Sequence, residues 1–240
     1  MFVSLFTLIL SCFSCSGLQE DTSFVNNYAP TDTTLTKSGG RTYKYLALGD
    51  SYTIGQNVQA KDRFPAQTVQ ILQSQKVNIT TVDYIATTGW ATPNLLSAIK
   101  YRPPSANYDI VTLLIGVNDQ YQHRDTAGYR LHFSQLLKKS IEFAGNRASR
   151  VVVLSIPDYS ATPFVAVNKK HKVSREINVF NAINKQVTLA YNIAYLDITR
   201  ASRKAATDPT LVGSDDLHPS GIEYGEWAAM LAPLIQKALQ

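Results

Sequence analysis

The sequence has 240 residues, of which 45% are hydrophobic and 17% are charged, and its formal net charge at pH 7 is +5. This composition is typical of a globular protein with a sizeable core, and it excludes a disordered chain. The charge balance is mild, and we expect the densest basic cluster, Lys169-Lys170-His171-Lys172, to be a solvated loop, so no nucleic-acid partner is predicted.

The two cysteines, Cys12 and Cys15, lie in the first fifteen residues, so the rest of the chain cannot form a disulfide or use a cysteine nucleophile. Residues 1–16 contain an apolar run of signal-peptide length, too short to span a bilayer comfortably. Small residues followed by cysteine resemble a bacterial lipoprotein signal, although a basic n-region is missing. We predict an exported protein, periplasmic or anchored to a membrane by a lipid on Cys12 or Cys15; the alternative is a buried N-terminal strand.

Residues 17–40 are rich in Thr, Asp, Asn and Ser, and we predict a flexible tether before a single domain over residues 41–240. Within that domain, short apolar runs predict strands over residues 43–48, 80–86, 109–115, 150–156 and 194–198. Apolar residues at helical spacing predict helices over residues 64–75, 94–99, 128–143, 174–189 and 219–239. Strands that alternate with helices predict an α/β fold, with a central parallel sheet of about five strands covered on both faces.

The first predicted strand is cut off by Gly49, and Asp50 and Ser51 follow at its tip. In an open α/β sheet, ligands bind outside the carboxyl ends of the strands. Ser51 is therefore well placed to be a nucleophile, although serines also fill turns, where they make local hydrogen bonds.

Three further polar stretches follow predicted strands. Gly89 comes after the second strand, Asn118 after the third, and His218 lies past the fifth, just before the last helix. A carboxylate three residues before His218 can fold back toward its imidazole, which favours Asp215 over its neighbour Asp216 as the orienting group. An asparagine side chain, or the backbone N–H of a glycine, can bind negative charge that develops in a reaction.

Four short motifs thus lie in one order along the chain: Gly49-Asp50-Ser51, then Gly89, then Gly116-Val117-Asn118-Asp119, then Asp215-Asp216-Leu217-His218. In this order they resemble the SGNH (GDSL-type) hydrolase superfamily, which contains esterases, lipases and lysophospholipases. The resemblance covers most of the predicted domain. It implies a flavodoxin-like, three-layer α/β/α sandwich and ester hydrolysis without a metal or organic cofactor. The chain departs from the pattern at Tyr52, where the family's name has Leu, and Thr88 gives Gly89 no signature of its own.

Carried over to the matching positions, the resemblance implies that Ser51 attacks the ester carbonyl, His218 takes and returns the proton, and Asp215 holds the histidine tautomer. It also implies that the oxyanion rests on the backbone N–H groups of Ser51 and Gly89 and on the side chain of Asn118. An acyl-enzyme would form and water would release it. Small acyl esters, acetylated carbohydrates and lysophospholipids stay open as substrates, because a fold does not determine its substrate.

Other protein classes fit the sequence less well. An α/β-hydrolase is disfavoured, because Ser51 does not lie in a Gly-x-Ser-x-Gly motif and because the Asp and His of that fold are far apart in the chain. Glycine-rich nucleotide-binding patterns are missing. The alternative function is a non-catalytic, carbohydrate-binding surface lipoprotein on the same fold, which would have no need for the Ser, Asn and His together. Trp90, Tyr121 and Tyr159 follow predicted strands and either line an acyl or sugar pocket or pack the loops.

Overall fold

The computed structural model describes residues 41–105 and 107–240. The predicted signal segment with Cys12 and Cys15 and the predicted tether lie outside the described residues. In the part of the chain that is described, one parallel sheet is formed by β1 (Thr42–Gly49), β2 (Asn78–Ala86), β3 (Ile110–Leu114), β4 (Val151–Leu154) and β5 (Ala194–Leu196).

The strand order across the sheet is β2-β1-β3-β4-β5. This is the order of flavodoxin-like, doubly wound sheets, in which the chain changes direction across the sheet between β1 and β3. The crevice outside the carboxyl ends of these two strands is the place where such folds bind ligands. We therefore expect the functional site at the ends of β1 and β3.

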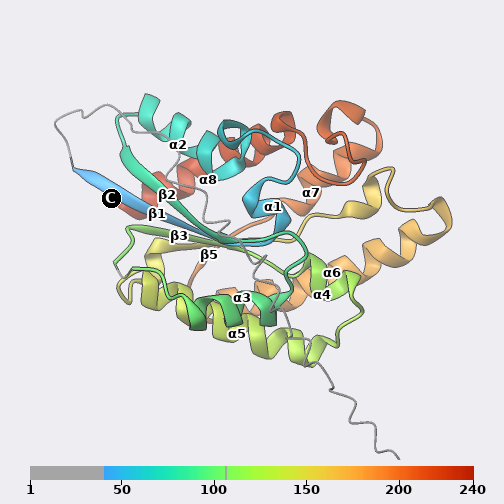
Figure 1. Ribbon diagram of the computed structural model, residues 1–240, viewed down its shortest axis with the longest axis horizontal. Coiled ribbons are helices and arrows are strands. Elements are labelled where there is room, and N and C mark those ends of the chain that lie inside the picture. The colour runs from blue at the N-terminus through green and yellow to red at the C-terminus, as the bar shows by residue number, and fades with distance from the viewer. Residues whose placement is uncertain (1–40, 106) are drawn as a thin grey trace, which may run out of the picture.

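Helices cover both faces of the sheet (Figure 1). On one face lie α2 (Phe64–Ser74) and α8 (Gly221–Leu239), which pack against each other, and the other face carries α3 (Thr92–Tyr101), α5 (Thr126–Phe143) and α6 (Val167–Ala190). Short helices follow three strands: α1 (Ser51–Ile54), α4 (Val117–Tyr121) and α7 (Thr199–Ser202). Further 3₁₀ turns span Ala60–Asp62, Ala148–Arg150, Tyr159–Ala161, Arg203–Ala206 and Pro209–Leu211. The predicted three-layer α/β/α sandwich is confirmed.

The central strand β1 forms the middle of the core. Its residues Tyr45–Leu48 are fully buried, because helices cover both faces of the sheet and leave no solvent-facing side. Tyr45 lies between Val82 of β2 and Ile110 of β3 in the strand register. Its hydroxyl lies 3.0 Å from the Thr112 hydroxyl, so a polar group in the core has a hydrogen-bond partner.

The elements lie close to their predicted positions, with one difference at α6. This helix begins at Val167, two turns before the predicted start at residue 174, so the basic cluster Lys169–Lys172 is helical and the prediction of a loop was wrong. Most of residues 167–172 are exposed. Because these two turns bury no apolar side, they have no apolar periodicity that would reveal the helix.

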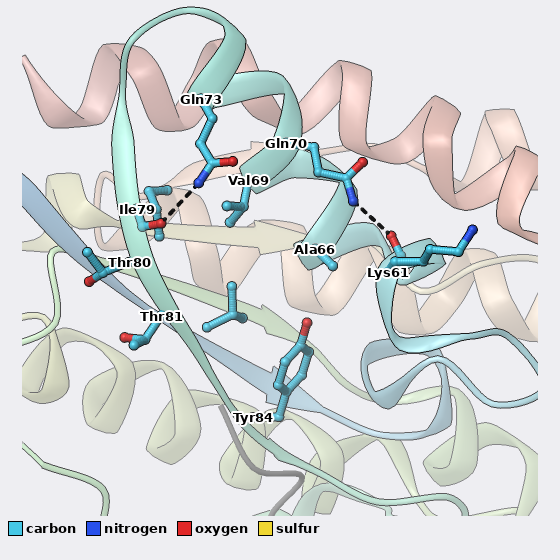
Figure 2. A pocket seen from close by; sticks show the side chains of 10 residues that line it. Lys61, Ala66, Val69, Gln70, Gln73, Ile79, Thr80, Thr81 and Tyr84 are labelled. Carbon is cyan, nitrogen blue, oxygen red and sulfur yellow. Dashed lines mark hydrogen bonds between the residues drawn. The ribbon is translucent and has the colours of Figure 1, made fainter. Parts of the chain in front are cut away.

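A small cavity of about 50 Å³ lies between α2 and the edge strand β2 (Figure 2). Gln73 donates a hydrogen bond to the Ile79 carbonyl across it, and Gln70 donates one to the Lys61 carbonyl at its rim. This cavity lies beside the side chains of β2 and away from the ends of β1 and β3. No helix in the described ranges is long and apolar enough to cross a membrane.

Candidate active site

Ser51 lies where β1 turns sharply into the short helix α1. Gly49 permits this turn, because a Cβ there would overlap the Thr53 side chain and the backbone of β3. The helix ends after one turn at Gly55, which has a φ of +71° that favours glycine. Ser51 is therefore held at the carboxyl end of the sheet, and 4% of it is exposed.

His218 lies beside Ser51, in the loop that precedes α8. Its Nε2 atom is 2.9 Å from Ser51 Oγ, and its Nδ1 atom is 2.5 Å from Asp215 Oδ2. The histidine ring packs on the Tyr52 ring, with 5.0 Å between the ring centroids. His218 is 6% exposed, so its ring is held between the serine, the carboxylate and this aromatic side chain.

The loop around Asp215 explains why this residue, and not Asp216, reaches the imidazole. Asp215 Oδ1 accepts hydrogen bonds from the backbone N–H groups of Leu217 (3.2 Å) and His218 (2.9 Å), which leaves Oδ2 directed at the ring. Asp216 has a φ of +60° and is exposed. Burial disfavours the charged form of Asp215, but the hydrogen bonds from His218 and Leu217 outweigh it and lower the pKa of the carboxyl group.

Gly89 lies in the loop after β2, and Asn118 lies in α4, and these two neighbouring segments bind each other. Asn118 Nδ2 donates to the Trp90 carbonyl at 3.0 Å, and Gln122 Nε2 donates to the Gly89 carbonyl at 3.2 Å. Gly89 has a φ of +82°, and a Cβ on it would meet no atom within 4 Å. The peptide at Gly89 is thus fixed by its neighbours and faces open space.

Asp119, which also lies in α4, makes a second connection between this helix and the segment after β2. Its carboxylate accepts hydrogen bonds from the backbone N–H of Thr92 at 2.8 Å and from the Thr92 hydroxyl at 2.6 Å. Thr92 is the first residue of α3, so Asp119 ties the end of β3 to the start of that helix. Burial raises the pKa of Asp119, and the hydrogen bonds from Thr92 oppose that effect.

Asp50 is fully buried directly before Ser51. One carboxyl oxygen accepts a hydrogen bond from the Tyr52 backbone N–H at 3.0 Å, and the other has no hydrogen-bond partner within the described residues. Burial raises the pKa of Asp50 to about 8, with a smaller contribution from the negative charge of Asp119. Asp50 therefore caps the turn that carries Ser51.

The predicted site residues Ser51, Gly89, Asn118 and His218 all line one cavity of about 160 Å³ at the carboxyl ends of β1 and β3. The rest of its wall is mainly apolar and comprises Tyr52, Thr88, Val117, Tyr121, Tyr159, Phe164 and Leu217. Tyr121 and Tyr159 were candidates for the wall, whereas Trp90 packs against the core. Sequence reasoning missed Phe164, whose only signal is an aromatic side chain in the loop after β4.

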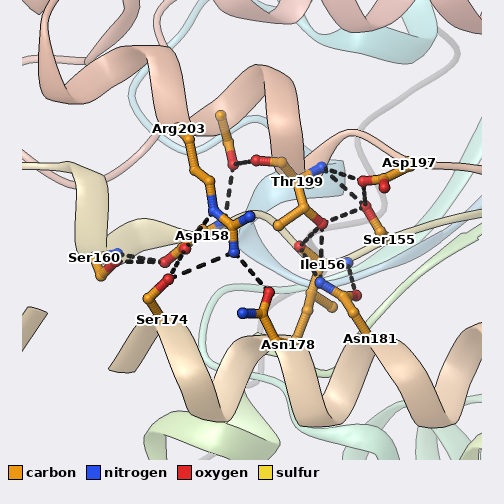
Figure 3. Close-up of polar contacts among 11 residues, drawn as sticks. Ser155, Ile156, Asp158, Ser160, Ser174, Asn178, Asn181, Asp197, Thr199 and Arg203 are labelled. Carbon is orange, nitrogen blue, oxygen red and sulfur yellow. Dashed lines mark hydrogen bonds and ion pairs between the residues drawn. The ribbon is translucent and has the colours of Figure 1, made fainter. Parts of the chain in front are cut away.

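A buried polar network fixes the loop that carries Tyr159 (Figure 3). Asp158, which is 1% exposed, accepts hydrogen bonds from Ser160 and Ser174 (each 2.6 Å) and from Arg203 Nε (2.8 Å). Although burial opposes ionisation, these hydrogen bonds lower the pKa of Asp158. The loop after β4 is thereby tied to α6 and to the 3₁₀ turn that contains Arg203.

The sequence and the fold were compared with known proteins. A family model described as GDSL-like lipase/acylhydrolase matches residues 47–222, whereas no curated protein matches the sequence. Similar solved structures include a variant of an acetyl xylan esterase from Geobacillus stearothermophilus, with a TM-score of 0.63, 19% identity and coverage of 80% of this chain and 94% of that one.

Two further structures have similar values. A lipase/acylhydrolase from Enterococcus faecalis has a TM-score of 0.62 and 18% identity, and the match covers 82% of this chain and 97% of that one. The psychrotrophic esterase EstA from a Pseudoalteromonas species has a TM-score of 0.59 and 16% identity, with coverage of 82% and 98%. At these identities the similarity to solved structures supports the fold alone, and the family model is the evidence for ester hydrolysis. Because that model matches most of the folded domain, the chain belongs to the GDSL-like lipase/acylhydrolase family and is a carboxylic ester hydrolase.

Proposed function

We propose that the protein hydrolyses esters through a catalytic triad of Ser51, His218 and Asp215. The observation that carries this proposal is the unbroken series of contacts from Ser51 Oγ to His218 Nε2 (2.9 Å) and from His218 Nδ1 to Asp215 Oδ2 (2.5 Å). In this geometry His218 removes the proton as Ser51 attacks the carbonyl carbon, and Asp215 stabilises the resulting imidazolium. The same histidine then protonates the leaving alkoxide, and water releases the acyl group from Ser51.

Three donors are proposed for the oxyanion: the backbone N–H groups of Ser51 and Gly89 and the side-chain amide of Asn118. All three residues line the cavity at the nucleophile. An asparagine amide has two N–H groups, and the bond from Asn118 to the Trp90 carbonyl uses one of them and fixes the plane of the amide. We propose that the second N–H, which also lies near the Asp50 carboxyl group, turns to the negative charge that develops in the transition state. A single donor of this kind contributes about 10²- to 10³-fold to kcat.

The size of the catalytic cavity favours short acyl groups. Its volume of about 160 Å³ is below the roughly 300–1,000 Å³ of pockets that enclose drug-sized ligands. We therefore favour esters of short acids, including acetylated carbohydrates, over lysophospholipids with long acyl chains. The acetyl xylan esterase among the similar structures fits this choice. Export of the protein and lipidation at Cys12 or Cys15 stay predictions from the sequence.

An ester-hydrolysis assay tests the proposal. The purified protein should hydrolyse p-nitrophenyl acetate and butyrate faster than the octanoate, and Ser51→Ala should abolish this turnover. Ser134→Ala, which removes a half-buried hydroxyl on α5 that does not line the cavity, is the matched control and should behave like the wild type. A p-nitrophenyl phosphonate should lose p-nitrophenol to Ser51 and add the mass of its phosphonyl group to the wild type, and it should leave Ser51→Ala unmodified. Equal turnover by Ser51→Ala and the wild type would refute the triad and favour the alternative of a carbohydrate-binding module.

A further inference from the structure

A second cavity, of about 400 Å³, adjoins the catalytic one. The two cavities share the side chains of Tyr121, Tyr159 and Phe164, which therefore form a common wall between them. The rest of the second cavity is formed by the end of α4 with the residues after it and by the first three turns of α6. We call it the α6 cleft. A substrate whose ester group lies at Ser51 can extend past the aromatic wall into this cleft.

The aromatic wall is partly open to solvent, and hydrogen bonds to α4 and α6 hold it in place. The three ring pairs have centroid distances of 6.3, 6.3 and 6.4 Å, and about half of Tyr121 and of Phe164 is exposed. The Tyr159 hydroxyl donates to Gln120 Oε1 at 2.7 Å, and Gln120 Nε2 donates to Glu176 Oε2 at 2.7 Å. Hydrogen bonds through Gln120 therefore connect the aromatic wall of the catalytic cavity to α6.

The charges that line the α6 cleft are mainly positive. Lys169 and Lys172 line it together with His123, and Glu176 is the one acidic residue among its lining side chains. Glu176 is already engaged by Gln120 and lies 3.8 Å from Lys172 Nζ. Lys169 has no ion pair within the described residues. The first turn of α6 also lacks an acidic residue, so the positive end of the helix dipole adds to this charge.

We propose that the α6 cleft binds an anionic group on the part of the substrate that does not react, so that the protein prefers esters that also carry a carboxylate or a phosphate. This inference rests on the proposed function, because it places the reacting ester at Ser51. Lys169 supplies the free charge, and Lys172 shares its own with Glu176. These residues touch no reacting atom and would set specificity by attracting one class of ester.

Substrate pairs that differ by one charge test this proposal. On the alcohol side the pair is 4-acetoxybenzoate and 4-acetoxybenzamide, and on the acyl side it is mono-p-nitrophenyl adipate and p-nitrophenyl adipamate. Because exposed ion pairs contribute little, we expect kcat/KM to favour the anion by about three- to tenfold in at least one pair at low salt. The preference should shrink as the salt concentration rises toward about 1 M.

Charge variants identify the residues responsible. Lys169→Gln should bring the preferred pair's ratio close to one, and Lys172→Gln should lower it less. Arg175→Gln removes the same charge from an exposed site on α6 that does not line the cleft, and it should keep the wild-type ratio. A ratio near one for both pairs in the wild type, or an equal loss in Arg175→Gln, would overturn the proposal.

A binding measurement separates this proposal from the proposed function. NMR titration of Ser51→Ala with 4-acetoxybenzoate and 4-acetoxybenzamide measures affinity without turnover, and the anion should bind more tightly in a manner that depends on Lys169. O-acetylated galacturonic acid and an O-acetylated sugar phosphate, each compared with its uncharged counterpart, then show whether a sugar acid or a phosphate supplies the anion. Hydrolysis of neutral esters without an anion preference would leave the triad standing and refute the anion site.

Discussion

Asp215→Asn tests the most specific part of the proposed site, because it removes one charge and keeps the shape of the side chain. The amide oxygen of asparagine can still accept the hydrogen bonds that Leu217 and His218 donate from their backbone. The loop should therefore keep its conformation. What is lost is the negative charge that faces the imidazolium, which forms as Ser51 gives up its proton. Because the amide NH₂ then faces Nδ1 and can only donate, the acceptor that keeps Nε2 free to take that proton is lost as well.

The size of this loss can be worked out from the position of the carboxylate. At an effective dielectric constant of about 20, two unit charges about 4 Å apart attract each other by about 4 kcal/mol, which is close to 10³-fold in rate. The Asp215 side chain is 28% exposed, so solvent screening reduces this value. With roughly half of it remaining, about 2 kcal/mol, the rate falls about 30-fold. We expect kcat to fall between about 30- and 10³-fold, with KM little changed.

The assay is the hydrolysis of p-nitrophenyl acetate by the wild type, Asp215→Asn and Asp216→Asn at neutral pH. Asp216 is exposed and makes no side-chain contact with His218 in the described structure, so Asp216→Asn should retain nearly full activity. Thermal unfolding shows whether each variant is folded. If Asp215→Asn were as active as the wild type, or if Asp216→Asn lost as much, then the contact with His218 would not be the one that supports catalysis.

Two further predictions concern the surroundings of the site. Arg203→Met leaves the buried carboxylate of Asp158 without its cation, which should lower the free energy of unfolding by about 2 kcal/mol in urea titrations. It should also raise KM for short esters, because Asp158 holds the loop of Tyr159. An unchanged KM would show that this network does not position the wall of the pocket. Burial raises the pKa of Glu223 to about 8, so the folded protein keeps a proton that the unfolded chain loses above about pH 4, and stability falls as the pH rises from 5 to 8. Glu223→Gln should remove about 3 to 4 kcal/mol of that fall, and an equal pH dependence in both proteins would contradict it.

The fold could be predicted from the sequence because its signals are local. The runs that became β1 and β3 are apolar on both faces, which is the pattern of a buried parallel strand. The helices appear wherever one side packs on the sheet. The first two turns of α6 pack on little, so their sequence has no such pattern and the start of that helix was misplaced. Local sequence patterns reflect which side chains are buried, so an exposed helix end has almost no such pattern.

The candidate site was predictable to the extent that its residues follow strands. Ser51 and Asn118 come after β1 and β3, and adjacent parallel strands bring their carboxyl ends together, so their proximity follows from the topology. Asp215 could be preferred over Asp216 because spacing within one turn decides which side chain folds back on the histidine. The contact between Asp119 and Thr92 could not be foreseen, because it joins α4 to the start of α3 across 27 residues of sequence.

The wall of the cavity was the least predictable part, and the reason bears on specificity. Tyr121 is the last residue of α4, whereas Tyr159 and Phe164 follow β4. Their positions depend on contacts with α6 and with the polar network around Asp158. No residue near them in the sequence signals that arrangement. Ser51 and Asn118, in contrast, lie directly after the strands β1 and β3, which fix their positions. Chemistry in this protein is therefore encoded by short motifs, whereas the choice of substrate is encoded by long-range packing between the α6 side of the sheet and its loops. Substitutions in α6 should accordingly change the relative kcat/KM values for different esters more than they change the rate of the hydrolysis itself.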